Sequence, residues 1–186
     1  KDRLAARLGP DANDIWASTF HSACVRILRR DIDRLGFDKD FTIYDTDDSK
    51  RVIKDVLKEK HLDEKTYPPR SVLAAISHSK DQYESIEDFT KRAEAANDWR
   101  MKDYARIYAA YEKRLRTANA LDFDDIIFHT VTLLQQEPEV LDYYQRKFRY
   151  VLVDEYQDTN HLQYLLTSLL AGGYQNLCVV GDDDQS

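Results

Sequence analysis

The sequence predicts an α/β fold in which a mostly helical segment is inserted into a parallel sheet. Residues 150–153 and 176–180 are short apolar runs rich in β-branched side chains, as expected of strands buried on both faces. A helical pattern lies between them, and the order strand, helix, strand predicts a parallel crossover. Between 41 and 120 the pattern is helical after a brief extended start. We therefore divide the chain into residues 1–40, 41–120 and 121–186.

Residues 1–40 are predicted to form a strand followed by a helix. The strand is the apolar run 15–18, and Thr19 can cap the helix that follows it. Apolar residues then recur with the helical period until Gly36 ends the pattern. The polar face of this helix carries basic and acidic residues: Arg26, Arg29, Arg30, Arg34, Asp31 and Asp33. We expect these groups to pair with one another rather than to form a dedicated nucleic-acid groove.

Four helices are predicted between residues 41 and 120. Their expected starts are Asp45 or Thr46, the pair Pro68-Pro69, Ser85, and a position near Trp99. Ser85 and Asp88 resemble a capping box with Asp in place of Glu. The last helix carries apolar and aromatic residues at helical spacing: Tyr104, Ile107, Tyr108, Tyr111 and Leu115. This spacing matches burial, so we expect a core stripe rather than a base-stacking platform.

Residues 121–186 return to an α/β pattern. Asp122 can cap a helix whose dipole Asp124 and Asp125 complement, and Pro138 can open the next helix. A further helix separates the two predicted strands. Both strands end in polar residues, and open α/β sheets bind ligands at the carboxyl ends of their strands. The strand ends are therefore the first place to look for a site.

The composition bounds the class of protein. The 186 residues include 27 Lys+Arg and 34 Asp+Glu, a net charge of −7, and no apolar run approaches a membrane span. We expect a cytoplasmic protein. The two cysteines, Cys24 and Cys178, are too few for a disulfide framework or a zinc cluster, and buried thiols are expected.

The net charge by itself argues against a simple basic nucleic-acid binder. It is unevenly distributed, however, because residues 121–186 carry 3 basic and 12 acidic side chains. The other two parts of the chain are together slightly basic. The acidic excess thus belongs to the part that contains the strand ends.

An acidic pair follows the first of the two strands. Asp154-Glu155 has the arrangement that a nucleotide hydrolase needs beside its triphosphate. One carboxylate can hold Mg²⁺ while the other orients or deprotonates the attacking water. An acidic turn after a strand is also common as a solvated loop, so the pair alone leaves both interpretations open.

Four separated strings extend this signal, and with them the chain resembles the UvrD/PcrA/Rep family of superfamily 1 DNA helicases. The string DEYQDT at 154–159 is similar to the family's motif II, and VVGDDDQS at 179–186 to the start of its motif III. The string STFHS at 18–22 resembles motif Ib, and LDFDD at 121–125 resembles the segment preceding motif II. The four occur in the family's order over nearly the whole chain.

The resemblance implies roles at a site for ATP and Mg²⁺. Asp154 would coordinate Mg²⁺, and Glu155 would activate the hydrolytic water. Gln157 would help to order motif II. Gln185 would contact the γ-phosphate region and couple it to the DNA site. The residues 182–184 remain open to a simpler interpretation as a solvated loop.

The resemblance also implies contacts with single-stranded DNA through Thr19 and His21. A hydroxyl at a helix start and an adjacent imidazole can both donate to phosphate, as can the free amides of the helix. Thr19 is equally well explained as an N-cap, and His21 as a surface or satisfied core histidine. For the LDFDD segment at 121–125 we favour a structural capping role.

The implied architecture is a partial RecA-like P-loop NTPase domain. Residues 1–40 and 121–186 would be parts of motor domain 1A, and 41–120 would be the helical 1B subdomain. The phosphate-binding pattern G-x-x-x-x-G-K-[ST] is not present, because none of the five glycines precedes a lysine. We therefore expect a piece of a longer helicase that moves 3′-to-5′ on DNA using ATP. By itself the piece is expected to be inactive, and an exposed sheet surface would favour self-association.

Two alternatives remain. One is a non-catalytic DNA-binding or scaffold domain that has kept the helicase outline. The intact Asp154, Glu155 and Gln185 argue against it, because such a remnant does not need them together. The other is a stand-alone Mg²⁺-dependent phosphohydrolase or nuclease. It would require further acids at a third strand end, and the sequence offers no clear set.

Overall fold

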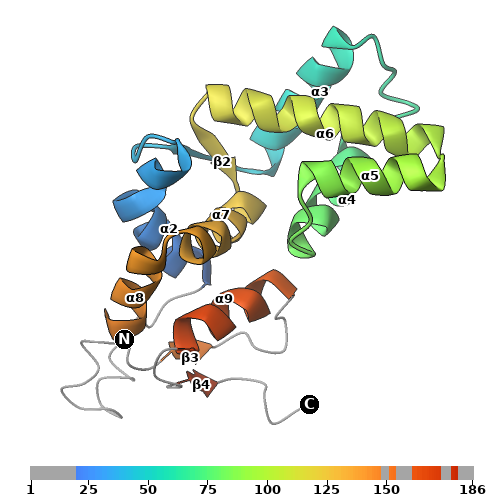
Figure 1. The fold of residues 1–186 in the computed structure, drawn as a ribbon. Helices are drawn as coiled ribbons and strands as arrows, with labels where there is room; N and C mark the ends of the chain where they lie inside the picture. The colour runs from blue at the N-terminus through green and yellow to red at the C-terminus, as the bar shows by residue number, and fades with distance from the viewer. Residues whose placement is uncertain (1–19, 148–150, 154–160, 173–176, 180–186) are drawn as a thin grey trace. The chain divides into compact units, whose positions relative to one another are not determined.

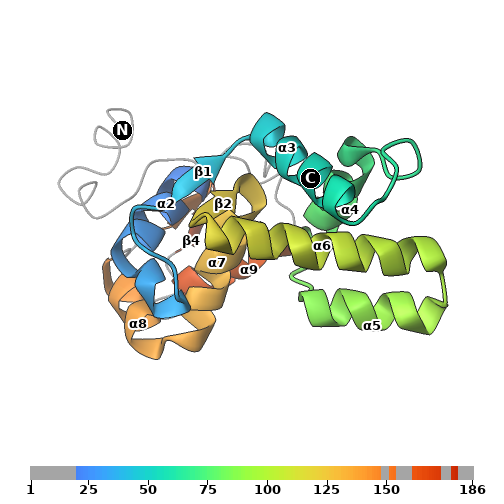
Figure 2. The same ribbon diagram turned by 90° about the horizontal axis from the view of Figure 1, so that it is seen from above.

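The structure is a computed structural model that describes residues 20–147, 151–153, 161–172 and 177–179. The chain divides into two compact units, with residues 40–125 forming unit 2. The residues on either side of it form unit 1, and the chain passes from unit 2 to unit 1 between Asp125 and Ile126. Figures 1 and 2 show the elements of both units from two directions.

Unit 1 combines helices with a small parallel sheet. Its described elements are α2 Phe20–Asp31, η2 Ile32–Leu35, most of α7 Phe123–Gln136, α8 Pro138–Lys147, β3 Val151–Val153, α9 His161–Ala171 and β4 Leu177–Val179. Strand β3 pairs in parallel with β4, and α9 packs on β3 and α8. The predicted strand–helix–strand crossover is confirmed. The predicted strand at 15–18 lies outside the described residues.

The helix predicted from Phe20 ends as expected at Gly36. Its last turn, η2, tightens into a 3₁₀ helix, and Gly36 adopts the left-handed conformation with φ 91°. Glycine has no Cβ, so it enters this conformation at little cost. The Cys24 side chain is fully buried on the inner face, and burial raises the pKa of its thiol to about 12. It is therefore an inert core thiol, as predicted.

The arginine face of α2 makes one of the predicted pairs and also contacts outside the helix. Arg30 and Asp31 lie 2.7 Å apart, as an expected ion pair. Arg34 reaches the start of α8, where its guanidinium lies 3.4 Å from Glu137. Arg29 donates to the backbone carbonyl of Lys39 at 2.8 Å. The prediction considered only residues on this helix, so it did not include partners from other parts of the chain.

Unit 2 is mostly helical. Its elements are β1 Thr42–Tyr44, α3 Thr46–Glu59, α4 Pro69–Asp81, α5 Ile86–Ala96, α6 Trp99–Thr117, β2 Ala120–Asp122 and the first turn of α7. Both views show α5 lying alongside α6 (Figures 1 and 2). The four helices start where the sequence predicted, and the tyrosine stripe of α6 is core, with Tyr108 and Tyr111 buried. Ser85 caps α5 by accepting from the Asp88 amide at 3.0 Å.

A short parallel ribbon closes unit 2. Strand β1 pairs with β2 in the register Thr42 to Ala120 and Tyr44 to Asp122. The extended segment at β1 was predicted, but β2 was not, because three residues are too few to show a period. Unit 2 consequently runs to Asp125 and includes the LDFDD segment, which the sequence division assigned to the following part. Because the two strands are parallel, α3, which follows β1, and α7, which follows β2, both start at the carboxyl edge of this ribbon.

No helix among the described residues is long and apolar enough to span a membrane.

Candidate functional site

The carboxyl ends of β3 and β4 lie at the same edge of their sheet. Val153 pairs with Val179 in the parallel register, so the chain leaves both strands on that edge. Asp154 and Glu155 follow β3 directly in the sequence. The predicted site residues Asp154, Glu155, Gln157, Gln185 and Thr19 all lie outside the described residues. The described structure thus supplies the strands that precede the motifs.

His21 is the one predicted site residue that the structure describes. It lies in the first turn of α2 and is half-buried. The first turn of α2 contains no acidic residue. The positive end of the helix dipole is therefore not offset by a local carboxylate, which suits an anion.

A groove lies at the carboxyl edge of the β1–β2 ribbon, within unit 2. It has a volume of about 230 Å³ and is lined by the starts of α3 and α7 and by one face of α4. Its wall carries two cations, Lys50 and Arg70, several hydroxyl groups and three acids, which are Asp45, Asp122 and Asp124. Phe123, the first residue of α7, also lines it and is 48% exposed. Cations beside an exposed aromatic ring are groups that contact phosphates and bases.

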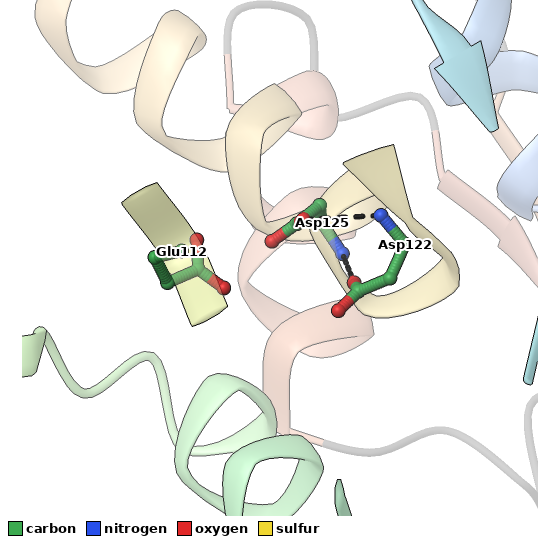
Figure 3. A group of neighbouring side chains, drawn as sticks. All are labelled: Glu112, Asp122 and Asp125. Carbon is green, nitrogen blue, oxygen red and sulfur yellow. Dashed lines mark hydrogen bonds between the residues drawn. The ribbon is translucent and has the colours of Figure 1, made fainter. Parts of the chain in front are cut away.

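Two reciprocal capping boxes stand at this edge. In the first, the Asp45 carboxylate accepts from the Asp48 amide at 2.8 Å, and the Asp48 carboxylate accepts from the Asp45 amide at 3.1 Å. In the second, Asp122 and Asp125 exchange the same two bonds at 2.8 and 3.1 Å (Figure 3). The predicted capping role of Asp122 is therefore confirmed. Asp125 does more than complement the dipole, because it is itself part of the box.

A buried lysine lies against the second box. The Lys80 ammonium, near the end of α4, lies 2.9 Å from Asp122, 2.7 Å from Asp125 and 2.6 Å from Glu112 of α6. Lys80 and Asp125 are each only 1% exposed. The Tyr111 hydroxyl adds a hydrogen bond to Asp122 at 2.8 Å. One ammonium thus gathers three carboxylates in the interior of unit 2.

Mutual attraction and burial set the protonation of this group, which we call the Lys80 cluster (Lys80, Glu112, Asp122 and Asp125). Burial opposes the charge on Lys80, but the three carboxylates outweigh it and hold the pKa of Lys80 well above its usual value. Burial opposes the charge on Asp122 too, yet Lys80 and the hydrogen bonds lower its pKa. Burial and repulsion from Asp122 and Glu112 raise the pKa of Asp125 well above its usual value. Asp125 is therefore the carboxyl that keeps a proton most readily.

The Lys80 cluster is not a metal site as it stands. Its three carboxylates have oxygens within 4.8 Å of one another and are the one such acidic group among the described residues (Figure 3). The Lys80 ammonium already lies within ion-pair distance of all three. The acids at the end of β2 therefore do not supply the third strand-end set that a stand-alone phosphohydrolase needs.

Sequence reasoning missed Lys80, although the sequence held a signal. Val72, Ile76 and Lys80 follow one another at intervals of four, and the first two are core residues of α4. A lysine that continues an apolar stripe must extend out of the core or find buried partners. The position of Lys80 in the apolar stripe thus indicates that its charge needs a buried partner. It does not identify the partners, because they lie on other elements.

A parallel strand pair in one unit and a mostly helical unit inserted between two parts of the chain define an α/β protein with a helical insertion. Residues 1–186 match the UvrD/REP helicase N-terminal domain family over their whole length, so the chain belongs to this family. It is 54% identical to the ATP-dependent DNA helicase PcrA of Bacillus subtilis (strain 168), across 100% of this chain and 25% of that protein. The PcrA helicases of Staphylococcus epidermidis and Staphylococcus aureus are 51% and 50% identical over the same shares. The chain thus spans about a quarter of the relatives it matches.

Proposed function

We propose that this chain is the motif II-bearing part of an ATP-dependent DNA helicase that moves 3′-to-5′ on single-stranded DNA and unwinds duplexes in the cytoplasm. Family membership over the whole chain carries the proposal. The parallel register of β3 and β4 supports it, because both strands deliver their following residues to one sheet edge. The relatives' name adds ATP and DNA as the expected substrate and partner.

In this proposal the acids after β3 perform hydrolysis. Glu155 accepts a proton from the attacking water and aims the water at the γ-phosphate. Asp154 holds Mg²⁺, for which oxygen ligands are suited, and the ion when bound neutralises charge on the phosphates. Gln157 orders the loop that carries these acids. Gln185 senses the γ-phosphate region and passes its state to the DNA site.

DNA contacts are proposed at two places. The first turn of α2 offers His21 to the phosphate backbone, with no acid in that turn to oppose it, and Thr19 precedes the helix in the sequence. Unit 2 offers the groove at the β1–β2 edge, whose lining includes Lys50, Arg70 and the exposed ring of Phe123. The slightly basic balance of the chain outside 121–186 fits the first of these places.

The test uses the longer protein that contains this chain. DNA-stimulated ATP hydrolysis should fall about 10²-fold or more in Glu155→Gln, because a general base contributes about 10²–10⁴-fold. Binding of single-stranded DNA, measured by fluorescence anisotropy, should be retained. Glu139→Gln, at an exposed position of α8, is the matched control and should leave both activities unchanged. Equal hydrolysis by Glu155→Gln and the control would rule out the proposed mechanism.

The alternative is a non-catalytic DNA-binding or scaffold domain. It predicts DNA binding without hydrolysis in the longer protein, whatever residue stands at 155. For the 186-residue chain by itself we propose no measurable ATP turnover, since it carries no phosphate-binding loop. DNA-stimulated turnover by the isolated chain, lost in Glu155→Gln, would contradict that part of the proposal alone.

A further inference from the structure

We propose that Lys80 is the internal cation of a preformed three-carboxylate site, and that its ammonium holds unit 2 together as a bound divalent ion would. Through Glu112 it reaches α6, through Asp122 it reaches β2, and through Asp125 it reaches the first turn of α7. The inference concerns the folding of unit 2. It therefore stands or falls independently of the proposed ATP and DNA chemistry.

The geometry is that of a filled cation site. The three carboxylates converge, with one oxygen of each lying within 4.8 Å of the other two (Figure 3). Each is within 2.6–2.9 Å of the same nitrogen. Metal sites built from carboxylates have the same plan, with oxygens gathered around one positive centre. Here the positive centre is covalently part of the chain.

A simple packing role does not account for this arrangement. The intervals Val72, Ile76, Lys80 place the side chain in the core stripe of α4, where methionine would fit by shape. If packing were its purpose, Lys80→Met would be harmless or stabilising. Three clustered carboxylates would instead repel one another strongly without a cation between them. The charge of Lys80 is thus the feature that the site requires.

The ion cluster also anchors a connection. Asp122 ends β2, and Asp125 is the last residue of unit 2 before the chain continues into unit 1. Phe123 lies between these two anchored residues and remains exposed to the groove. Lys80 therefore acts as a positioning residue for the first turn of α7, without lining that groove itself.

The experiment compares three lysine substitutions in the full 186-residue chain during Mn²⁺ titration, with thermal unfolding followed by circular dichroism. Lys80→Ala opens the space of the side chain, Lys80→Met fills it without charge, and Lys58→Ala removes an exposed lysine of α3 as a control. Both Lys80 variants should unfold well below wild type, whereas the Lys58 variant should match it. Saturating Mn²⁺ should raise the midpoint of Lys80→Ala by at least about 4 °C more than that of wild type or Lys80→Met.

A second variant guards against failure to fold. Asp122→Asn removes one carboxylate charge and keeps a side chain that can cap α7, so the double variant Lys80→Met/Asp122→Asn should unfold at a higher temperature than Lys80→Met. If Lys80→Ala is unfolded in the absence of metal, Mn²⁺ should restore its helical signal. The inference is overturned if Lys80→Met is as stable as wild type, or if Lys80→Ala gains no more from Mn²⁺ than wild type gains. It is also overturned if Asp122→Asn lowers the unfolding temperature of Lys80→Met further.

Discussion

The two Asp-x-x-Asp capping boxes of unit 2 have the same hydrogen bonds and different surroundings. The first box, Asp45 and Asp48, lies at the start of α3, and the second, Asp122 and Asp125, lies at the start of α7. Within each box the two residues exchange amide-to-carboxylate hydrogen bonds of 2.8 and 3.1 Å. The α3 box faces solvent, and Arg51 lies 3.7 Å from Asp48. The α7 box is buried against Lys80.

The difference shows how burial changes the meaning of one motif. In the α3 box the hydrogen bond from the Asp48 amide is the main cause that lowers the pKa of Asp45, and water shields the rest. In the α7 box the same amide bonds are too weak to hold the buried charge of Asp122, so a counter-cation is required. A cap at the surface stabilises one helix end. A buried cap with its own cation connects β2 and α7 to α4 and α6.

Neutralising the two N-cap residues gives the largest contrast between the boxes. Asp122→Asn weakens the hold on a buried ammonium and should cost about 2–3 kcal/mol of unfolding free energy, within the range for buried hydrogen-bonded charges. Asp45→Asn should leave the unfolding free energy nearly unchanged, since asparagine is itself a good N-cap. Urea unfolding of the two single variants measures both. Equal costs would mean that the Lys80 cluster adds nothing to the capping box.

The dependence of stability on pH gives a smaller contrast, with opposite signs in the two boxes. The folded-state pKa of Asp125 is raised, so its contribution is present in acid and is lost as pH rises through that value. The pKa of Asp45 is lowered, so its contribution is present near neutral pH and is lost in acid. Asp125→Asn should therefore gain stability relative to wild type as pH rises from about 4 to 8. Asp45→Asn should change relative to wild type only below about pH 4.

Urea unfolding at a series of pH values measures these differences, and subtracting wild type removes titrations common to all three proteins. Four of the groups that face Asp125 do not interfere in this window. The pKa values of Lys80, Tyr108 and Tyr111 are raised and that of Asp122 is lowered, so all four titrate outside it. A difference for Asp125→Asn that stays flat with pH would contradict the assignment of the retained proton.

The sequence predicted the helices of both boxes but not what distinguishes the boxes. Helix starts follow from local chemistry: Pro69 at the start of α4 and Ser85 before α5 act on amides within a few residues. The α7 box depends on Lys80 and Glu112, which are 42 and 10 residues from Asp122. Local sequence patterns do not identify partners that are distant along the chain. The strand β2 was not predicted for a related reason, because its three residues form a strand only by pairing with β1.

At the proposed catalytic site, too, the local elements were predicted from the sequence pattern, whereas the roles of single residues were not. The strands β3 and β4 and their parallel pairing were predicted from apolar runs and element order, and the strands and their pairing are confirmed. The roles of Asp154, Glu155, Gln157 and Gln185 came from motif resemblance and remain proposals. His21 is placed on α2 as predicted, while its contact with DNA remains to be tested.

Hydrogen exchange of two amides in the wild-type chain tests the central claim most directly. The amides of Asp48 and Asp125 make equivalent hydrogen bonds of 2.8 Å, so bond length does not separate them. If the Lys80 cluster anchors the start of α7, the Asp125 amide opens only in large unfolding events and exchanges at least about 100-fold more slowly than that of Asp48. Equal protection of the two amides, measured by NMR at one pH, would contradict the account.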